Sequence, residues 1–451
     1  MELELIKRVY FVGAGGIGMS ALARYFNKRG CLVCGYDKTR TVLTAALEEE
    51  GILLTYTDSL DSLHPDFKVN APDTLIVYTP AIPKDSALLN YFRDNGFDLQ
   101  KRSQVLGIIS KGQFCIAVAG THGKTTTSSI VAHILTDSGF GCTAFLGGIA
   151  TNYQSNFLIG DNDVVVVEAD EYDRSFLTLH PDIAVITSMD ADHLDIYGDA
   201  AQLHESFHLF AGQLKAGGTL FIKQGLPIIE GITYGTEEAA VVRALNIRVE
   251  QGNFEFDYTD GEVTINNLQL MLPGKHNVEN ATVAIAAALK LGISPEKIKR
   301  AIAGFKGVKR RFEYIVREDR HIYIDDYAHH PEELRACFEA VRQLYPDKKM
   351  TVIFQPHLFS RTRDFGDDFA SVLSTADDLV LLDIYPAREL PMEGIDARFL
   401  LNKITLASSN VYTKDAALQY VKDQQPELLL TVGAGDIDTL IQPLKNILTN
   451  A

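Results

Sequence analysis

The chain has 451 residues, which is too long for one ordinary hydrophobic core, and about 150 residues per domain suggests about three domains. Hydrophobic residues make up 46% of the chain and charged residues 22%, the balance of a soluble globular protein. The net charge of −17 argues against nucleic acids and anionic membranes as partners, because both require basic surfaces. It is compatible with local positive pockets for phosphates.

The cysteines and the N-terminal residues indicate a reducing, cytoplasmic setting. Cys31 and Cys34 have C-x-x-C spacing, but they lie in an apolar, strand-like run, where residues three apart point to opposite faces. We therefore expect buried thiols, without a metal or redox role. The start of the chain lacks the pattern of a signal peptide, and no apolar run approaches the ~20 residues that span a bilayer.

The first third of the chain alternates between strand and helix patterns. Strands are predicted over 9–12, 32–36 and 75–78, and helices over 19–28 and 44–50. This alternation predicts parallel βαβ units.

A glycine cluster follows the first of these strands. Its pattern is G-x-G-x-x-G, and Asp37 ends the next strand about 20 residues later. Such glycines permit a tight turn and let a helix N-terminus face a diphosphate. The pattern suits NAD or FAD, another nucleotide such as a nucleotide sugar, or a purely structural turn. Its residues are Gly13, Gly15, Gly16, Ile17, Gly18 and Met19.

A second glycine cluster is more specific. It lies between a predicted strand over 114–119 and a helix over 125–138, although Val118 takes the place of the first glycine of the standard phosphate loop. A lysine at a helix start opposes the helix dipole, so Lys124 requires an anion. We predict that the loop binds phosphates and that Thr125 binds Mg²⁺. The loop comprises Gly120, Thr121, His122, Gly123, Lys124, Thr125 and Thr126.

Two acidic clusters follow strands predicted over 164–167 and 183–188. Glu168 belongs to the first cluster, EADEYD, and His193 to the second, DADHLD. Carboxylates and an imidazole at the carboxyl ends of strands suit Mg²⁺ or Mn²⁺ that arrives with a nucleotide. The alternative is a pair of solvated loops whose acids cap helices.

The segment 243–272 has short alternating stretches that predict hairpins, and 277–291 predicts a helix that ends at Gly292. Asn277 and Asn280 open this helix, either as an N-cap or as ligands of an adenine edge. Arg311 follows near a predicted domain boundary, where it is either a solvated charge or a ligand of a transferring phosphoryl group.

A third α/β pattern begins after the basic stretch 309–311. Its predicted strands cover 321–324, 351–354, 379–382 and 428–432. Polar groups follow the first two strands, and we expect them to converge on a small anionic substrate; they include Asp326, Tyr327, His329, His357 and Arg361. The stretch 433–436 is interpreted as a tight turn. The predicted domains are 1–110, 111–307 and 308–451.

Taken together, these motifs resemble those of the Mur ligases, the ATP-dependent amide-forming enzymes of peptidoglycan precursor synthesis. The shared motifs are GTHGKTTT at 120–127, EADE at 168–171, DHLD at 192–195, HNVEN at 276–280 and RRF at 310–312. The stretches VGAGGIGMSALA, DDYAHHPEE and FQPHLFSRTRD resemble the branch that adds the first amino acid. The resemblance covers nearly the whole chain.

The resemblance implies an α/β fold of three domains: a Rossmann-like domain for a UDP-sugar, a central P-loop ATPase-like domain with a mostly parallel sheet, and a Rossmann-like domain for an amino acid. It implies that ATP, with Mg²⁺ or Mn²⁺, phosphorylates the lactoyl carboxylate of UDP-N-acetylmuramate, and that L-alanine then attacks the acyl phosphate. We expect a monomer or a weak homodimer in cell wall biogenesis.

The resemblance also implies roles for individual residues. Lys124, Glu168, His193 and Arg311 are catalytic, and Thr125, Glu168 and His193 hold the metal. The loop 120–126 binds ATP with Asn277, Asn280, Arg311 and Asp326. The first glycine cluster and Asp37 bind the UDP-sugar. L-alanine meets Tyr327, His329, His357 and Arg361.

Two departures from the family pattern bear on the branch. Several sister ligases carry a carbamylated lysine downstream of the DHxD motif, whereas 194–210 contains no lysine, as in the alanine-adding branch. Ala328 and Glu332 replace an expected glycine and threonine beside the amino-acid pocket. The alternatives are a sister enzyme that recycles tripeptides, an NAD-dependent oxidoreductase built on the first glycine cluster, and a non-catalytic nucleotide-binding regulator.

Overall fold

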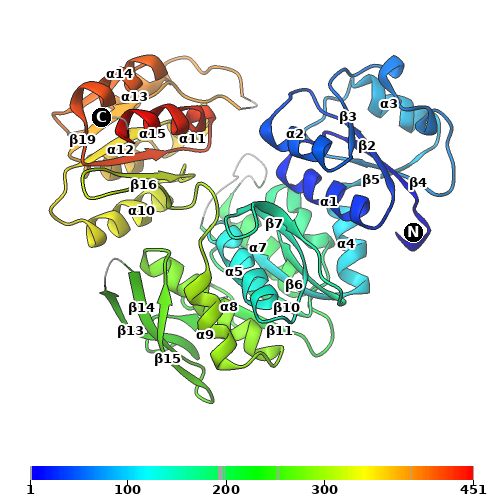
Figure 1. Cartoon of the computed structure of the whole chain (residues 1–451), viewed down its shortest axis with the longest axis horizontal. Helices are drawn as coiled ribbons and strands as arrows, with labels where there is room; N and C mark the ends of the chain where they lie inside the picture. Colours follow the sequence, from blue (N-terminus) through cyan, green and yellow to red (C-terminus); the bar gives the residue numbers. More distant parts are fainter. Residues whose placement is uncertain (1–2, 191–196, 198, 251–252, 388, 450–451) are drawn as a thin grey trace. The chain divides into compact units, whose positions relative to one another are not determined.

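The computed structural model describes residues 3–190, 197, 199–250, 253–387 and 389–449. It contains three β-sheets, each flanked by helices (Figure 1). Two compact units make up the chain. The first unit comprises residues 1–246, 256–268 and 279–305, and the second comprises 247–255, 269–278 and 306–451. None of the described helices is long and apolar enough to cross a membrane.

The first sheet has five parallel strands in the order β3-β2-β1-β4-β5. Its strands are β1 Arg8–Val12, β2 Leu32–Tyr36, β3 Leu53–Thr55, β4 Thr74–Tyr78 and β5 Asp98–Lys101, and its helices are α1 Ile17–Lys28, α2 Val42–Glu49, α3 Ala87–Asp94 and α4 Arg102–Gly112. Side chains of α1 and α4 pack on one face and those of α3 on the other. Both faces are therefore buried, as in other parallel sheets.

The second sheet has ten strands in the order β15-β14-β13-β12-β11-β10-β6-β9-β7-β8. The strands from β13 to β7 in this order are parallel, and β8 is antiparallel to β7. The strands are β6 Phe114–Ala119, β7 Thr143–Ala150, β8 Ser155–Leu158, β9 Val164–Glu168, β10 Ile183–Ile186, β11 Thr219–Lys223, β12 Ile232–Gly235, β13 Val242–Glu250, β14 Asn253–Thr259 and β15 Thr264–Leu270, and the helices are α5 Lys124–Asp137, α7 Ala200–Ala211, α8 Lys275–Lys290 and α9 Pro295–Gly304.

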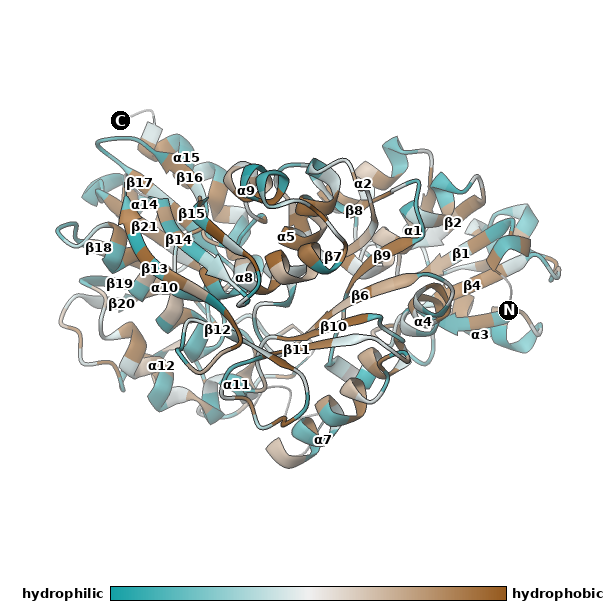
Figure 2. Cartoon of the chain, turned by 90° about the horizontal axis from the view of Figure 1, so that it is seen from below, coloured by the Kyte–Doolittle hydropathy of each residue, from teal (hydrophilic) through white to brown (hydrophobic). Residues whose placement is uncertain are grey.

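The hydropathy of the strands and helices agrees with their positions in the second sheet. The central strands β6 and β10 are mainly hydrophobic, whereas α7 has alternating hydrophobic and hydrophilic residues (Figure 2). A central parallel strand is covered on both faces and so carries a continuous apolar run. The three consecutive strands predicted as hairpins over 243–272 are β13, β14 and β15, which are neighbours at one edge of this sheet.

The third sheet has six strands in the order β16-β17-β21-β18-β19-β20, and all pairs except β16–β17 are parallel. Helices α10, α12 and α13 pack on one face and α14 and α15 on the other. The strands are β16 Glu313–Arg317, β17 Ile322–Asp326, β18 Met350–Phe354, β19 Asp378–Leu381, β20 Ser409–Val411 and β21 Leu428–Val432, and the helices are α10 Pro331–Leu344, α11 Phe359–Asp364, α12 Gly366–Leu373, α13 Ala397–Leu401, α14 Lys414–Gln424 and α15 Ile441–Thr449.

The first two sheets share one hydrophobic core. This core includes Phe11 of β1 and Leu22 of α1 together with Ala117 of β6 and Val167 of β9, all fully buried. The first sheet and the middle of the second therefore form one body, and the sites at their strand ends are held in a fixed arrangement.

Candidate active site

The predicted phosphate loop connects β6 to α5. Its backbone is left-handed at Gly123, with φ +83°, and reaches φ +138° at Gly120, both conformations that favour glycine. A Cβ atom at Gly120 would lie 2.1 Å from the hydroxyl of Thr187, and one at Gly123 would lie 2.9 Å from the side-chain oxygen of Asn280. Both glycines are therefore required by the backbone and by close neighbours. Asn280 therefore lies beside the loop.

Residues after β10 hold the loop in this shape. The backbone N–H of His122 donates to the hydroxyl of Ser188 at 2.6 Å, and the hydroxyls of Thr121 and Ser188 lie 2.9 Å apart. The hydroxyl of Thr187 donates to Ala119 O at 3.0 Å. These hydrogen bonds fix the conformation of the loop, so little ordering is needed when phosphate binds.

Lys124 has a carboxylate partner that the sequence did not reveal. Its ammonium donates to Gly120 O at 2.6 Å and pairs with Glu171 at 2.8 Å. The Lys124 side chain is 14% exposed and that of Glu171 only 1%. Burial alone would lower the pKa of the ammonium, but Glu171, Asp170 and Glu168 outweigh burial and raise it. Lys124 is therefore charged and already positioned at the start of α5.

Glu168 ends β9 beside the same helix. Its carboxylate accepts a hydrogen bond from the hydroxyl of Thr125 at 3.1 Å and one from the backbone N–H of Gly147 at 2.9 Å. A hydroxyl and a carboxylate in contact are the hard oxygen donors that Mg²⁺ prefers, so these residues fit the predicted metal. His193 lies outside the described residues. Within the described ranges, no group of three or more His, Cys, Asp or Glu is arranged to hold a metal.

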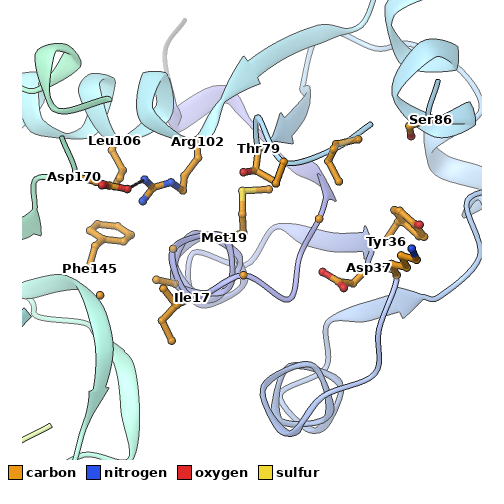
Figure 3. A pocket seen from close by; sticks show the side chains of 18 of the residues that line it. Ile17, Met19, Tyr36, Asp37, Thr79, Ser86, Arg102, Leu106, Phe145 and Asp170 are labelled. Carbon is orange, nitrogen blue, oxygen red and sulfur yellow. Dashed lines mark hydrogen bonds and ion pairs between the residues drawn. The ribbon is translucent and has the colours of Figure 1, made fainter. Parts of the chain in front are cut away.

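A cavity of about 740 Å³ extends from the first glycine cluster to this carboxylate. Figure 3 shows Tyr36, Asp37 and Ser86 at one end and Arg102, Asp170 and Phe145 at the other, with Met19 and Thr79 between them. The lining residues are Gly13, Gly16, Ile17, Gly18, Met19, Ala21, Tyr36, Asp37, Lys38, Asp58, Thr79, Ala81, Ile82, Pro83, Asp85, Ser86, Arg102, Leu106, Phe145, Leu146, Gly147, Glu168 and Asp170. The cavity lies wholly in the first compact unit.

The first glycine cluster forms one wall of the cavity. Gly13 has φ +92°, and the N–H of Gly15 donates to the carboxylate of Asp37 at 2.7 Å. Gly15 does not line the cavity, unlike the other glycines of the cluster. Sequence reasoning missed Thr79, Ser86 and Arg102, which follow β4, precede α3 and begin α4, respectively, and form no local motif.

A buried ion pair lies behind the third-domain motif. Asp325, fully buried, pairs with Arg310 at 2.9 Å and accepts a hydrogen bond from the hydroxyl of Thr431 at 2.6 Å. Arg310 also donates to Gly433 O at 2.6 Å. The turn at Gly433 has φ +146°, and a Cβ atom there would lie 2.7 Å from Gln355 O, consistent with the predicted tight turn. The ion pair thus ties the ends of β17 and β21 together.

Asp326 ends β17 beside this ion pair. Its carboxylate accepts backbone hydrogen bonds from Phe312 at 2.6 Å and Ala328 at 2.7 Å. Burial raises the pKa of Asp326 to about 6, although Arg311 and the two N–H groups oppose the rise.

Tyr327, His329 and His357 gather beside Asp326. The guanidinium of Arg311 lies 5.2 Å from the centre of the Tyr327 ring, and the rings of His329 and His357 are 5.6 Å apart. His329 also lies 3.3 Å from Glu333. The strands before the two histidines are consecutive in the chain, but β21 lies between them in the sheet, and the side chains bridge this gap.

Arg361 and Asn277 both lie within helices. Arg361 is in the short helix α11 that follows His357, and its side chain is nearly buried. Helix α8 begins at Lys275, so Asn277 lies inside the first turn and is not the N-cap. Its amide donates to Pro273 O at 2.7 Å.

The fold and these sites define an α/β nucleotide-binding enzyme with a phosphate loop beside a candidate metal carboxylate. Three family models match the chain in order: the catalytic domain of the Mur ligase family over residues 8–114, the Mur ligase middle domain over 118–288, and the glutamate ligase domain of Mur ligases over 310–435. The chain belongs to the Mur ligase family, and its three α/β domains follow in the order that the sequence predicted.

Curated relatives match the chain at full length. UDP-N-acetylmuramate–L-alanine ligase of Christiangramia forsetii is 49% identical over 99% of each chain. The protein of the same name from Flavobacterium psychrophilum is 50% identical, also over 99% of each chain.

Solved structures share the fold. UDP-N-acetylmuramate–alanine ligase of Thermotoga maritima is 27% identical, covers 98% of each chain and has a TM-score of 0.82. The MurF ligase of Thermotoga maritima, solved in complex with ADP, is 14% identical, with a TM-score of 0.61 over 100% of this chain and 99% of its own.

Proposed function

We propose that this enzyme joins L-alanine to the lactoyl carboxylate of UDP-N-acetylmuramate, with cleavage of ATP to ADP and phosphate, in peptidoglycan precursor synthesis. The observation that carries the proposal is the cavity, whose wall runs from a diphosphate-type glycine turn to Glu168 beside the phosphate loop. A nucleotide sugar bound along it would present its carboxylate near the ATP phosphates. The full-length similarity to ligases of this name supports the same substrates.

The phosphate loop would bind ATP. It leads into the start of α5, where the helix dipole favours anions. Lys124 would keep its pair with Glu171 and offer phosphate oxygens the N–H group that donates to Gly120 O, since the ion pair already orients its ammonium toward the loop. The same loop residues as in the sequence interpretation carry this role, namely Gly120, Thr121, His122, Gly123, Lys124, Thr125 and Thr126, while Asn277, Asn280 and Asp326 would meet the nucleoside.

Thr125 and Glu168, with His193, would hold Mg²⁺ or Mn²⁺. The ion would supply positive charge that offsets the charge on the phosphates. Glu168 is held for this role by Gly147, and Thr125 lies within hydrogen-bond distance of it.

The reaction needs an activated carboxylate, because a free carboxylate is a poor electrophile. A lactoyl carboxylate oxygen attacks the terminal phosphorus of ATP and ADP leaves, which gives an acyl phosphate. The amine nitrogen of L-alanine then attacks the acyl carbon, loses a proton, and phosphate leaves as the amide forms. Lys124 and Arg311 would stabilise charge on the transferred phosphoryl group.

Tyr327, His329, His357 and Arg361 would bind L-alanine. Arg361 suits the carboxylate of the amino acid, because a guanidinium offers two parallel N–H donors. The edge-to-face rings of His329 and His357 would form a wall that leaves space for a small side chain.

The experiment is phosphate release with Mg-ATP, UDP-N-acetylmuramate and single amino acids. We expect release that depends on L-alanine and yields a product one alanyl residue heavier by mass spectrometry. The matched reaction replaces L-alanine with the tripeptide L-alanyl-γ-D-glutamyl-meso-diaminopimelate. Release with the tripeptide alone would assign the chain to a recycling ligase, and release with neither would refute the proposal.

Lys124 provides the sharpest variant. Lys124→Ala should abolish turnover, but it also leaves the buried Glu171 carboxylate without its cation, which costs about 3–5 kcal/mol of stability. The pair Lys124→Met with Glu171→Gln removes both charges, so it should remain folded and inactive by phosphate release and circular dichroism. Activity of the folded double variant above about a tenth of wild type would contradict the role of Lys124.

A further inference from the structure

The cavity in the first compact unit carries more acidic than basic side chains. Its described lining contains the carboxylates Asp37, Asp58, Asp85, Glu168 and Asp170, but only two cations, Lys38 and Arg102. The proposed substrate brings a diphosphate and a carboxylate into this space. Such a ligand requires cations at contact distance, because like charges repel strongly in a partly desolvated site.

Arg102 is the half-buried cation of the two. It is the first residue of α4, and its side chain is 22% exposed, whereas Lys38 is exposed. In the part of the chain that the structure describes, its one ion pair is with Asp170, at 3.2 Å (Figure 3). A guanidinium has five N–H donors, so this single contact leaves most of them available to a ligand.

The guanidinium also lies against the start of α1. A Cβ atom at Gly18 would be 2.5 Å from one terminal nitrogen of Arg102 and 3.0 Å from its Cδ atom. The first turn of a helix has unpaired N–H groups and the positive end of the helix dipole, which together attract anions. Gly18 therefore admits an arginine to the end of the cavity where anions are already favoured.

Arg102 thus lies between two parts of the site. Gly18 belongs to the first glycine cluster, and Asp170 belongs to the acidic motif two residues after Glu168. Asp170 is 39% exposed, so it can be solvated when its partner leaves. An anion that enters the cavity can replace Asp170 on Arg102 without leaving a buried charge behind.

We propose that Arg102 binds an anionic group of the nucleotide-sugar substrate, either its diphosphate or its carboxylate, and that Asp170 holds the guanidinium in place until the substrate arrives. This inference rests on the proposed function, since it takes UDP-N-acetylmuramate as the ligand.

The test is the dissociation constant of UDP-N-acetylmuramate, measured by calorimetry without ATP. Arg102→Gln removes the charge and keeps most of the length of the side chain. It should weaken binding about 10- to 100-fold, the range for the loss of a charge-assisted contact. The affinity of Arg102→Lys should lie between those of wild type and Arg102→Gln, because lysine keeps the charge and lacks the planar guanidinium. Binding by Arg102→Gln within twofold of wild type would overturn the proposal.

Two further variants separate ligand binding from a structural tie. Asp170→Asn removes the same ion pair and keeps Arg102, so it should weaken binding much less than Arg102→Gln does; a loss equal to that of Arg102→Gln would show that only the ion pair matters. Arg8→Gln removes a comparable half-buried pair, with Asp73, at the opposite strand end of the first sheet. It should bind the substrate as wild type does.

Two ligands locate the anion. UDP-N-acetylglucosamine lacks the lactoyl carboxylate but keeps the diphosphate. If Arg102 binds the diphosphate, Arg102→Gln should bind both this ligand and UDP more weakly than wild type does. If Arg102 binds the carboxylate, the variant should bind these two ligands as tightly as wild type does, and only its binding of UDP-N-acetylmuramate should weaken. Failure of the wild type to bind UDP-N-acetylmuramate would count against the proposed function, whereas normal wild-type binding with an unaffected Arg102→Gln variant would count against Arg102 alone.

Discussion

At the scale of single residues, Glu168 depends on a glycine of a neighbouring strand. The N–H of Gly147 donates to one Glu168 oxygen at 2.9 Å, and a Cβ atom at Gly147 would lie 2.2 Å from both carboxylate oxygens. Any side chain larger than hydrogen at position 147 would therefore displace Glu168. The strand β7 thus sets where the candidate metal carboxylate lies.

Gly147→Ala should therefore displace Glu168 and weaken the response to Mg²⁺. We expect the Mg²⁺ concentration for half-maximal phosphate release to rise about tenfold or more, the usual loss when the support of a metal ligand is disturbed. Gly112→Ala is the matched control, because a Cβ atom at Gly112 meets nothing within 4 Å. An unchanged Mg²⁺ titration of Gly147→Ala would show that Glu168 does not hold the ion.

Asp326 gives a pH prediction. Burial raises its pKa to about 6, so it is ionised at pH 7.5 and mostly protonated at pH 5. If it accepts a hydrogen bond from the ribose, ATP affinity should fall as pH falls through 6. We expect a loss of about threefold to tenfold between pH 7.5 and 5, the scale of one hydrogen bond to a charged group.

Asp326→Asn is the control for this pH dependence. It should bind ATP more weakly than wild type at pH 7.5, and its affinity should change less between the two pH values. If the ATP affinities of the two proteins change equally between the two pH values, the group that titrates is not Asp326.

At the scale of elements, β8 is tied to the first turn of α1 by one buried side chain. The amide of Asn156 donates to Ile17 O and to the Ser20 hydroxyl, and its oxygen accepts a hydrogen bond from Arg24. Asn156 is fully buried. Since Ile17 lines the cavity, Asn156 links the second sheet to the wall that would bind the diphosphate.

Asn156→Ala should loosen this wall. We expect the dissociation constant of UDP-N-acetylmuramate to rise about tenfold while that of ATP stays the same, together with a stability loss of about 1–3 kcal/mol from unpaired buried groups. Asn162→Ala likewise removes three hydrogen bonds, with Phe140 O, Gly141 O and the Val164 N–H, away from α1. Equal effects of both variants on nucleotide-sugar binding would argue against a specific role for Asn156.

Burial accounts for part of the outcome of strand prediction at this scale. The predicted strands over 32–36, 114–119 and 428–432 agree with β2, β6 and β21, which are covered on both faces and carry apolar runs. Eight strands were missed: β3, β5, β8, β16 and β20 lie at sheet edges, whereas β7, β11 and β12 lie inside the second sheet. An edge strand has fewer buried positions, so β5, with the sequence Asp-Leu-Gln-Lys, leaves no apolar pattern.

At the largest scale, the first two sheets act as one body through a shared core. Tyr25 of α1 packs against Phe145 of β7, with ring centres 5.5 Å apart, and against Phe157 of β8, at 6.4 Å. The cavity therefore has walls from two sheets that cannot separate without breaking this core.

Tyr25→Ala should destabilise both sheets together. We expect about 3–5 kcal/mol lower stability, as for other large-to-small core changes, and lower hydrogen-exchange protection in both β1 and β7. Phe67→Ala is the matched control, because Phe67 packs on Tyr10 at the opposite face of the first sheet. It should lower protection in β1 and leave β7 unchanged. Loss confined to β1 in both variants would show that the two sheets unfold independently.

The sequence by itself determined the phosphate loop, the glycine cluster before α1, the parallel α/β domains and the family, because each rests on residues close together in the chain. The tertiary structure alone decided that Glu171 pairs with Lys124, that Gly147 holds Glu168 and that Arg102 lies between Gly18 and Asp170. These contacts join separate strands and helices, so no local spacing records them. They follow from which strands become neighbours when the apolar faces are buried.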